Sequence, residues 1–231
     1  MRSEDSTSFG RRLLSGAGAL YFAQLINFPL GILTNLLAVR LLLSADFGVF
    51  VAATLAITLG SFFSDGGCVT ALIRRPGKVE EDDFVAVWVY QLSVSAALGM
   101  LFFFAASEIS NFFSDLATRS AIASLIRVQA VVPFLIALSS VPLIQVERSL
   151  KYRQLAGVFV TVGVLERLLL MALLLLHFES MSYAYSRIAG LLLNAILLAV
   201  CSPWRPLELL RRAVQQGWRG ASLLRFGYAV Q

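Results

Sequence analysis

Long apolar stretches separated by short charged segments dominate the chain. Six of them, each roughly twenty residues or longer, lie at residues 13–39, 47–73, 84–106, 120–145, 155–176 and 183–201. A helix needs about 20 mostly apolar residues to cross a bilayer, whereas a strand of a membrane barrel needs only about ten, in alternation. The pattern therefore predicts an all-α integral membrane protein built as a six-helix bundle.

The segments outside these stretches suggest how the chain is organised. We expect residues 1–12 to form a polar cytoplasmic tail and residues 13–201 to form the transmembrane lobe. Residues 202–222 are rich in arginine, and their WRPLELLRRAV segment is typical of a short amphipathic helix at a membrane surface. Residues 223–231 are apolar and predict the start of a seventh transmembrane helix. We therefore expect the chain to be a fragment or a truncated form of a longer protein.

The composition agrees with a membrane protein. Hydrophobic residues make up 58% of the chain and charged residues only 14%, compared with about 25% charged residues in soluble domains. The formal net charge of +5 would suggest nucleic-acid binding in a soluble protein. Here the cytoplasmic loops of a membrane protein explain it, because lysine and arginine concentrate there. We expect membrane lipids, and no nucleic acid, as partners.

The distribution of basic residues predicts the orientation. The tail and the segments after the second, fourth and sixth stretches hold 3, 3, 3 and 5 Lys or Arg residues, 14 in all. The opposite side holds three, namely Arg40, Arg119 and Arg187. The positive-inside rule therefore places the N-terminus of this multi-pass protein in the cytoplasm.

Glycines and acidic residues mark the expected helix ends. Asp46 and Gly48 open the second stretch, and Asp65 and Gly66 interrupt its end. Aspartate caps helix N-termini, and glycine commonly follows the last residue of a helix, so helix-break and turn roles are predicted for these four residues. In the first stretch, Pro29 predicts a kink.

No catalytic or metal-binding motif is present in the sequence. The two cysteines, Cys68 and Cys201, show no CxxC spacing, and His177 is the single histidine. No Ser/His/Asp set and no phosphate-cradling glycine loop occurs either. We therefore expect no metal, no cofactor and no enzymatic activity.

Charged residues inside the apolar stretches are the main functional candidates. Glu166 and Arg167 lie in the middle of the fifth stretch, and Arg127 lies in the fourth. Charges at this depth are costly and usually face a partner or a water-filled cavity. With the predicted topology, Arg127 lies about 10 Å below the outer face and Glu166 about 16 Å above the inner face, so an Arg127–Glu166 ion pair is possible in a core about 30 Å thick. Arg167 would then face the cavity.

These charges have other readings. The pair could be structural, with no part in transport, or the carboxylate could carry a coupling proton or sodium ion. Gln24 and Asn27 in the first stretch could line the same cavity. For both amides, hydrogen bonding between helices is the alternative role.

Five short segments resemble, in order, the polysaccharide and oligosaccharide flippases of the multidrug/oligosaccharidyl-lipid/polysaccharide exporter superfamily. The second segment, SADFGVF at 44–50, is similar to the family pattern L-x-P-x-D-F-G-x-F/Y, with Ser44 in place of the proline. The third segment, FSDGG at 63–67 with ALIRR at 71–75, is similar to the pattern D-x-G followed by a basic pair. Gly67 stands where an apolar residue usually follows D-x-G. The segments are LLAVRLL at 36–42, SADFGVF at 44–50, FSDGG with ALIRR at 63–75, SLKY at 149–152 and RFGY at 225–228.

The resemblance implies a function. Members of this family have two helical lobes around a central cavity, and this chain would supply the N-terminal lobe. The implied activity is translocation of a lipid-linked oligosaccharide, of the polyprenyl pyrophosphate type, across the inner membrane during polysaccharide biosynthesis, by alternating access. A second transporter half or a second copy would be needed to close the cavity. The alternatives are a cation-coupled drug antiporter, a membrane-bound glycan-processing enzyme, and a non-transporting remnant that acts as a scaffold.

Overall fold

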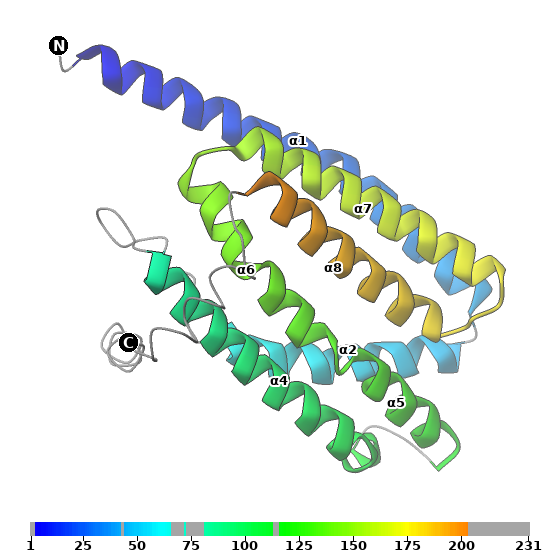
Figure 1. Cartoon of the computed structure of the whole chain (residues 1–231). Coiled ribbons are helices and arrows are strands. Elements are labelled where there is room, and N and C mark those ends of the chain that lie inside the picture. Colours follow the sequence, from blue (N-terminus) through cyan, green and yellow to red (C-terminus); the bar gives the residue numbers. More distant parts are fainter. Residues whose placement is uncertain (1–2, 43, 66–71, 73–80, 113–115, 203–231) are drawn as a thin grey trace.

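The structure, a computed structural model, describes residues 3–42, 44–65, 72, 81–112 and 116–202. Within these ranges the regular secondary structure is entirely helical (Figure 1). The all-α fold predicted from the apolar stretches is thus confirmed. The helices are α1 (Ser3–Leu41), α2 (Ser44–Asp65), α4 (Glu81–Asn111), α5 (Leu116–Gln129), α6 (Val132–Arg148), α7 (Tyr152–Leu175) and α8 (Met181–Cys201).

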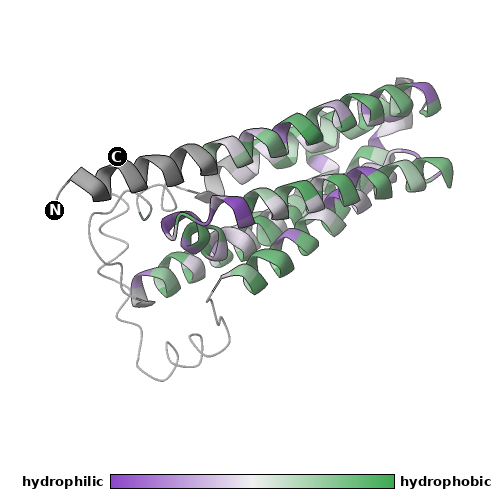
Figure 2. Cartoon of the chain, turned by 90° about the horizontal axis from the view of Figure 1, so that it is seen from above, coloured by the Kyte–Doolittle hydropathy of each residue, from purple (hydrophilic) through white to green (hydrophobic). Residues whose placement is uncertain are grey.

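Most of these helices can cross a membrane. In the described part of the chain, five stretches are long and apolar enough, and Asp46–Ser61 of α2 is a shorter apolar helix. Most of the helical ribbon in Figure 2 carries the green colour of hydrophobic residues. The chain is therefore a multi-pass membrane protein. The five stretches are Gly16–Leu41, Asp83–Asn111, Thr118–Arg148, Tyr152–Leu175 and Met181–Cys201.

The N-terminal helix is longer than predicted. α1 begins at Ser3, so most of the expected tail over residues 1–12 is helical. The helix also continues through Pro29 without interruption, although a proline in a helix removes one backbone hydrogen bond. The predicted linker at 202–222, apart from Ser202, and the predicted seventh helix at 223–231 lie outside the described residues.

The fourth predicted span is two helices rather than one. α5 ends at Gln129, and α6 begins at Val132. Pro133 has no backbone N–H to donate to the carbonyl of Gln129, so the helical ladder is interrupted at this point. The two halves have different neighbours, since α5 packs against α2 and α4, and α6 packs against α8 and α4.

Gly99 of α4 lies against this interruption. A Cβ atom at position 99 would stand 2.6 Å from the carbonyl oxygen of Ala130. Because the obstacle is backbone, it cannot move aside as a flexible side chain can. The glycine therefore allows α4 to approach the join between α5 and α6.

Replacing Gly99 with alanine is expected to destabilise the protein. Overpacking typically costs about 1–3 kcal/mol, which corresponds to a drop of several degrees in melting temperature. The measurement is thermal unfolding of the detergent-solubilised protein. Gly18→Ala is the matched control, because a Cβ at position 18 meets nothing within 4 Å. An equal melting temperature for both variants would contradict the close approach.

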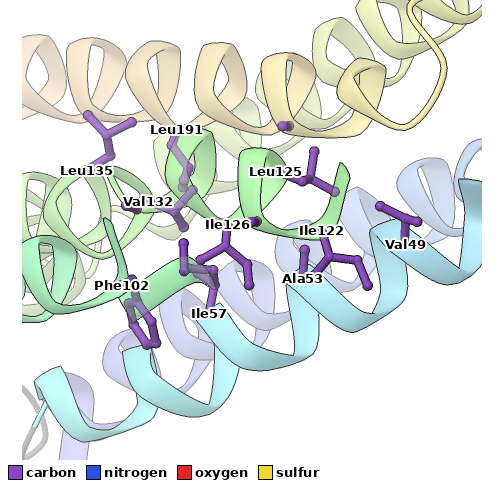
Figure 3. Packing of buried hydrophobic residues seen from close by; sticks show 14 residues of the cluster. Val49, Ala53, Ile57, Phe102, Ile122, Leu125, Ile126, Val132, Leu135 and Leu191 are labelled. Carbon is purple, nitrogen blue, oxygen red and sulfur yellow. The ribbon is translucent and has the colours of Figure 1, made fainter. Parts of the chain in front are cut away.

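The largest buried cluster joins α2, α4, α5, α6 and α8 (Figure 3). Its large side chains interdigitate around the α5–α6 join, and Phe102 packs directly onto Gly60 of α2. In a bilayer such packing stabilises helix association through van der Waals contact rather than exclusion of water. The residues labelled in Figure 3 are Val49, Ala53, Ile57, Phe102, Ile122, Leu125, Ile126, Val132, Leu135 and Leu191.

On the other side of the bundle, α1 and α7 lie side by side, and α8 packs against α7 (Figure 1). The contacts between α1 and α7 keep a constant register. Tyr152 meets Gly16, Gly163 meets Asn27 and Arg167 meets Gly31, and each α7 residue lies 136 positions after its α1 neighbour. The two helices therefore run parallel. Both were predicted to run from the inner to the outer face.

Candidate functional site

Glu166 of α7 points towards α8. Its Oε1 atom lies 3.6 Å from Nη1 of Arg187, and its side chain is 16% exposed against 53% for Arg187. Its Oε2 atom lies over Gly190, where a Cβ would stand only 2.5 Å away. Arg187 and Gly190 are three positions apart and so lie on one face of α8. Arg187 supplies the charge opposite to that of Glu166, and Gly190 leaves the space that the Glu166 carboxylate occupies.

Arg167 points towards a different helix. Consecutive residues of a helix project about 100° apart, and Arg167 lies over Gly31 of α1, with Nη2 3.7 Å from the position of a Cβ. Among the described residues, no ion pair or hydrogen bond engages its guanidinium group. Glu166 and Arg167 are thus neighbours in sequence that face different helices, α8 and α1.

The Arg127–Glu166 pair that the matching depths made possible does not form in the structure. Nη2 of Arg127 donates a hydrogen bond of 2.9 Å to Oγ of Ser107 on α4, and Glu166 pairs with Arg187. Matching depths along two helices do not fix their lateral positions. α5 packs against α2, α4 and α8, whereas α7 packs against α1, α8 and α6. Arg127 is therefore not part of the charged group on α7 and α8.

The two amide candidates of the first span, Asn27 and Gln24, have different surroundings in the structure. Nδ2 of Asn27 donates a hydrogen bond of 3.1 Å to the carbonyl oxygen of Phe159, which joins α1 to α7. Its Oδ1 atom is buried against Gly163 and has no hydrogen-bond partner among the described residues. Asn27 thus makes the alternative contact between helices. Gln24 is exposed on α1, about two helical turns before Gly31, against which Arg167 lies.

The helix-break residues lie at the ends of α2. Asp46 is in its first turn, where a negative charge interacts favourably with the helix dipole. Gly48 faces open space. Asp65 is the last residue of the helix, and Gly66 lies outside the described residues.

Sequence reasoning missed three residues that the structure singles out. Arg187 was placed on the outer flank, but it lies six residues into α8, about 9 Å along its axis. Tyr183 stacks on Phe50 of α2, with ring centroids 3.9 Å apart. Nη1 of Arg148 donates a hydrogen bond of 2.7 Å to the carbonyl of Leu72. The detectable signal for Arg187 was a charge with a glycine three positions later inside an apolar stretch.

The site is a charged layer within a helical bundle. Glu166, Arg167 and Arg187 together carry one net positive charge. In the part of the chain that the structure describes, no group of three or more His, Cys, Asp or Glu residues could hold a metal ion. The arrangement can offer guanidinium groups to an anionic ligand or hold the helices together through the ion pair.

This fold defines a class, the multi-pass α-helical membrane proteins. The sequence profile of the family described as "Polysaccharide biosynthesis protein" matches residues 36–228, which is most of the chain. The chain belongs to this family, whose membership indicates a role in polysaccharide synthesis or export at a bacterial membrane. No curated protein matches the chain, and neither does any solved structure.

Proposed function

We propose that the protein translocates a lipid-linked oligosaccharide across the bacterial inner membrane, as one lobe of an alternating-access transporter. The observation that carries this proposal is the charged layer of α7 and α8 within a member of a polysaccharide biosynthesis family. Charged residues inside a membrane bundle mark substrate or ion pathways more often than they mark lipid contacts. A polar headgroup that crosses the bilayer needs such a path.

The sign of the charge favours an anionic cargo. A polyprenyl pyrophosphate carries its negative charge next to the sugar, and arginine suits phosphate because its guanidinium group can donate two parallel hydrogen bonds. An antiporter of cationic drugs needs free carboxylates instead, and here Glu166 is held by Arg187. The net positive charge of the layer therefore supports the flippase over the antiporter.

A second lobe completes the transporter in this proposal. Large apolar side chains are exposed along α1, which packs chiefly on α7. A second half or a second copy of the chain would enclose the cavity against such a face. The exposed side chains of α1 include Tyr21, Phe22, Leu25, Phe28, Leu36 and Val39.

The orientation follows from the basic residues. We place the N-terminus in the cytoplasm on that basis alone. The parallel packing of α1 and α7 supports the predicted order of the spans, because the first and fifth spans of one chain must cross in the same direction. The competing remnant, which only scaffolds other envelope proteins, would share this topology without transport.

A reconstitution experiment tests the function. The full chain, alone and with its second half, is placed in liposomes with a fluorescent lipid-linked oligosaccharide in the inner leaflet, and its appearance in the outer leaflet is followed by lectin capture. We expect movement with both halves and none above empty liposomes with the monomeric chain alone. Movement by the monomer would contradict the need for a second lobe, and no movement by either sample would favour the remnant.

A further inference from the structure

The interruption between α5 and α6 leaves backbone donors and acceptors without helical partners. Pro133 has no N–H group, so the carbonyl of Gln129 receives no bond from the position four residues later. The first hydrogen bond of α6 runs from the N–H of Leu135 to the carbonyl of Val131, over 3.1 Å, and no side chain of the described residues caps this helix. The N–H group of Phe134 therefore has no partner within α6.

A buried hydroxyl group of α4 also lacks a partner. Ser95 is 0% exposed, and its Oγ atom makes no hydrogen bond within the described part of the chain. Serine in a helix can donate to the carbonyl four residues earlier, and Ser61 and Ser93 do so here, over 2.8 and 2.7 Å. An unsatisfied hydroxyl group inside a membrane bundle is costly. This cost points to a partner outside the helix that carries Ser95.

The packing of α4 on α6 brings this hydroxyl group to the interruption. Gly99 lies against the carbonyl oxygen of Ala130. Eleven residues before this glycine and eleven after this alanine, Trp88 and Val141 belong to one buried cluster. The two helices therefore run antiparallel in a single register, in which Ser95 lies level with the first turn of α6. Because Ser95 and Gly99 are four positions apart, they lie on one face of α4.

We propose that a water molecule is bound at this interruption, where it joins the Ser95 hydroxyl group to the unpaired backbone groups between α5 and α6. The chemistry of these groups determines the ligand. The N–H of Phe134 only donates, the carbonyls of Gln129 and Ala130 only accept, and a hydroxyl group does both. The N–H dipole repels a cation and the carbonyl dipoles repel an anion, whereas water donates and accepts at once. Buried waters typically make about three hydrogen bonds to such groups.

The bound water connects α4 to both halves of the broken helix. Pro133 forbids the direct backbone bond that would restore a continuous helix, and ordered water is one of the means by which interrupted transmembrane helices satisfy their backbone groups. This inference goes beyond the proposed function and does not depend on the cargo. Failure of oligosaccharide transport in liposomes would leave the water site intact.

Serine-to-alanine variants of the full chain test the site by thermal unfolding in detergent. If the Ser95 hydroxyl group holds the water, S95A loses hydrogen bonds and is expected to lower the melting temperature by about 2–4 °C. S93A is the matched control, because the Ser93 hydroxyl group bonds within its own helix, and it is expected to shift the melting temperature by no more than about 1 °C. If the Ser95 hydroxyl group has no partner, its removal relieves an unsatisfied buried group. A melting temperature of S95A no lower than that of S93A therefore overturns the proposal.

X-ray radiolysis detects the water itself, because hydroxyl radicals formed from a bound water oxidise the side chains beside it. Pro133 is fully buried at the interruption, and Ile122 is fully buried in α5, about three turns earlier. After correction for intrinsic reactivity, oxidation of Pro133 is expected to exceed that of Ile122 several-fold, and to fall to the level of Ile122 in S95A. Equal oxidation of both residues in the original protein overturns the water site. Stabilisation by sodium chloride over choline chloride at equal ionic strength, lost in S95A, would identify a bound cation and overturn it as well.

Discussion

Replacing Glu166 with arginine is expected to destabilise the protein strongly, and adding Arg187→Glu to the same chain is expected to restore most of the loss. The single variant would place two arginines face to face between α7 and α8, where an ion pair now forms. Breaking a fully buried ion pair costs about 3–5 kcal/mol. Here about 2–3 kcal/mol is expected, because the Arg187 side chain is 53% exposed and partly screened. Thermal unfolding in a neutral detergent measures both effects.

A second charge exchange discriminates between the pair that was predicted and the pair that forms. Combining Glu166→Arg with Arg127→Glu is expected to give no recovery, because Arg127 bonds to Ser107 on the α4 side of the bundle. The two double variants have the same net charge, so the comparison isolates position. Recovery with position 127 and none with position 187 would show that the helices are arranged differently.

Replacing Gly190 with alanine is expected to disturb the same pair without changing any charge. The new Cβ would stand 2.5 Å from Oε2 and 2.9 Å from Cδ of Glu166, so the carboxylate must leave its position beside Arg187. A loss of about 1–3 kcal/mol follows from the overpacking, although alanine is the better helix former. The melting temperature in detergent measures this loss.

Two further variants make the Gly190 result specific. Gly157→Ala on α7 is the control, since its Cβ meets nothing within 4 Å, and it should leave stability unchanged or slightly raised. Combining Gly190→Ala with Glu166→Ala removes the obstructed side chain, so the two changes should be far from additive. Strict additivity would mean that Glu166 does not occupy the space over Gly190.

Hydrophobic length predicted the helices well because a bilayer imposes it. The stretches at 155–176 and 183–201 correspond closely to α7 and α8, since a spanning helix must satisfy its backbone hydrogen bonds internally. Proline was a poorer guide. Pro29 leaves α1 continuous, whereas Pro133 coincides with the break between α5 and α6. The neighbouring helices decide which outcome a proline has, and one apolar stretch does not reveal its neighbours.

The charged residues were found from sequence, but their partners were not. Glu166 and Arg167 stand out in any hydropathy reading, because charge is rare at membrane depth. Depth is a single coordinate, however, and Arg127 matched Glu166 in depth while lying on another side of the bundle. Arg187 was overlooked because it lies near the start of its stretch. Its side chain can reach Glu166 because Gly190 has no Cβ, which allows the Glu166 carboxylate to lie directly against α8.

The constant register between α1 and α7 limits how the bundle can deform. Gly16, Gly163 and Gly31 each receive a large side chain from the opposite helix. A slide by one turn would move Asn27 from Gly163 to the level of Phe159 or Arg167, so bulky groups would collide where small ones now interlock. Sliding of one helix along the other is therefore opposed by steric clashes, and the two helices must move together as one rigid unit. Bending of the bundle would therefore fall on other elements, such as the join between α5 and α6, where the helical hydrogen-bond ladder is interrupted.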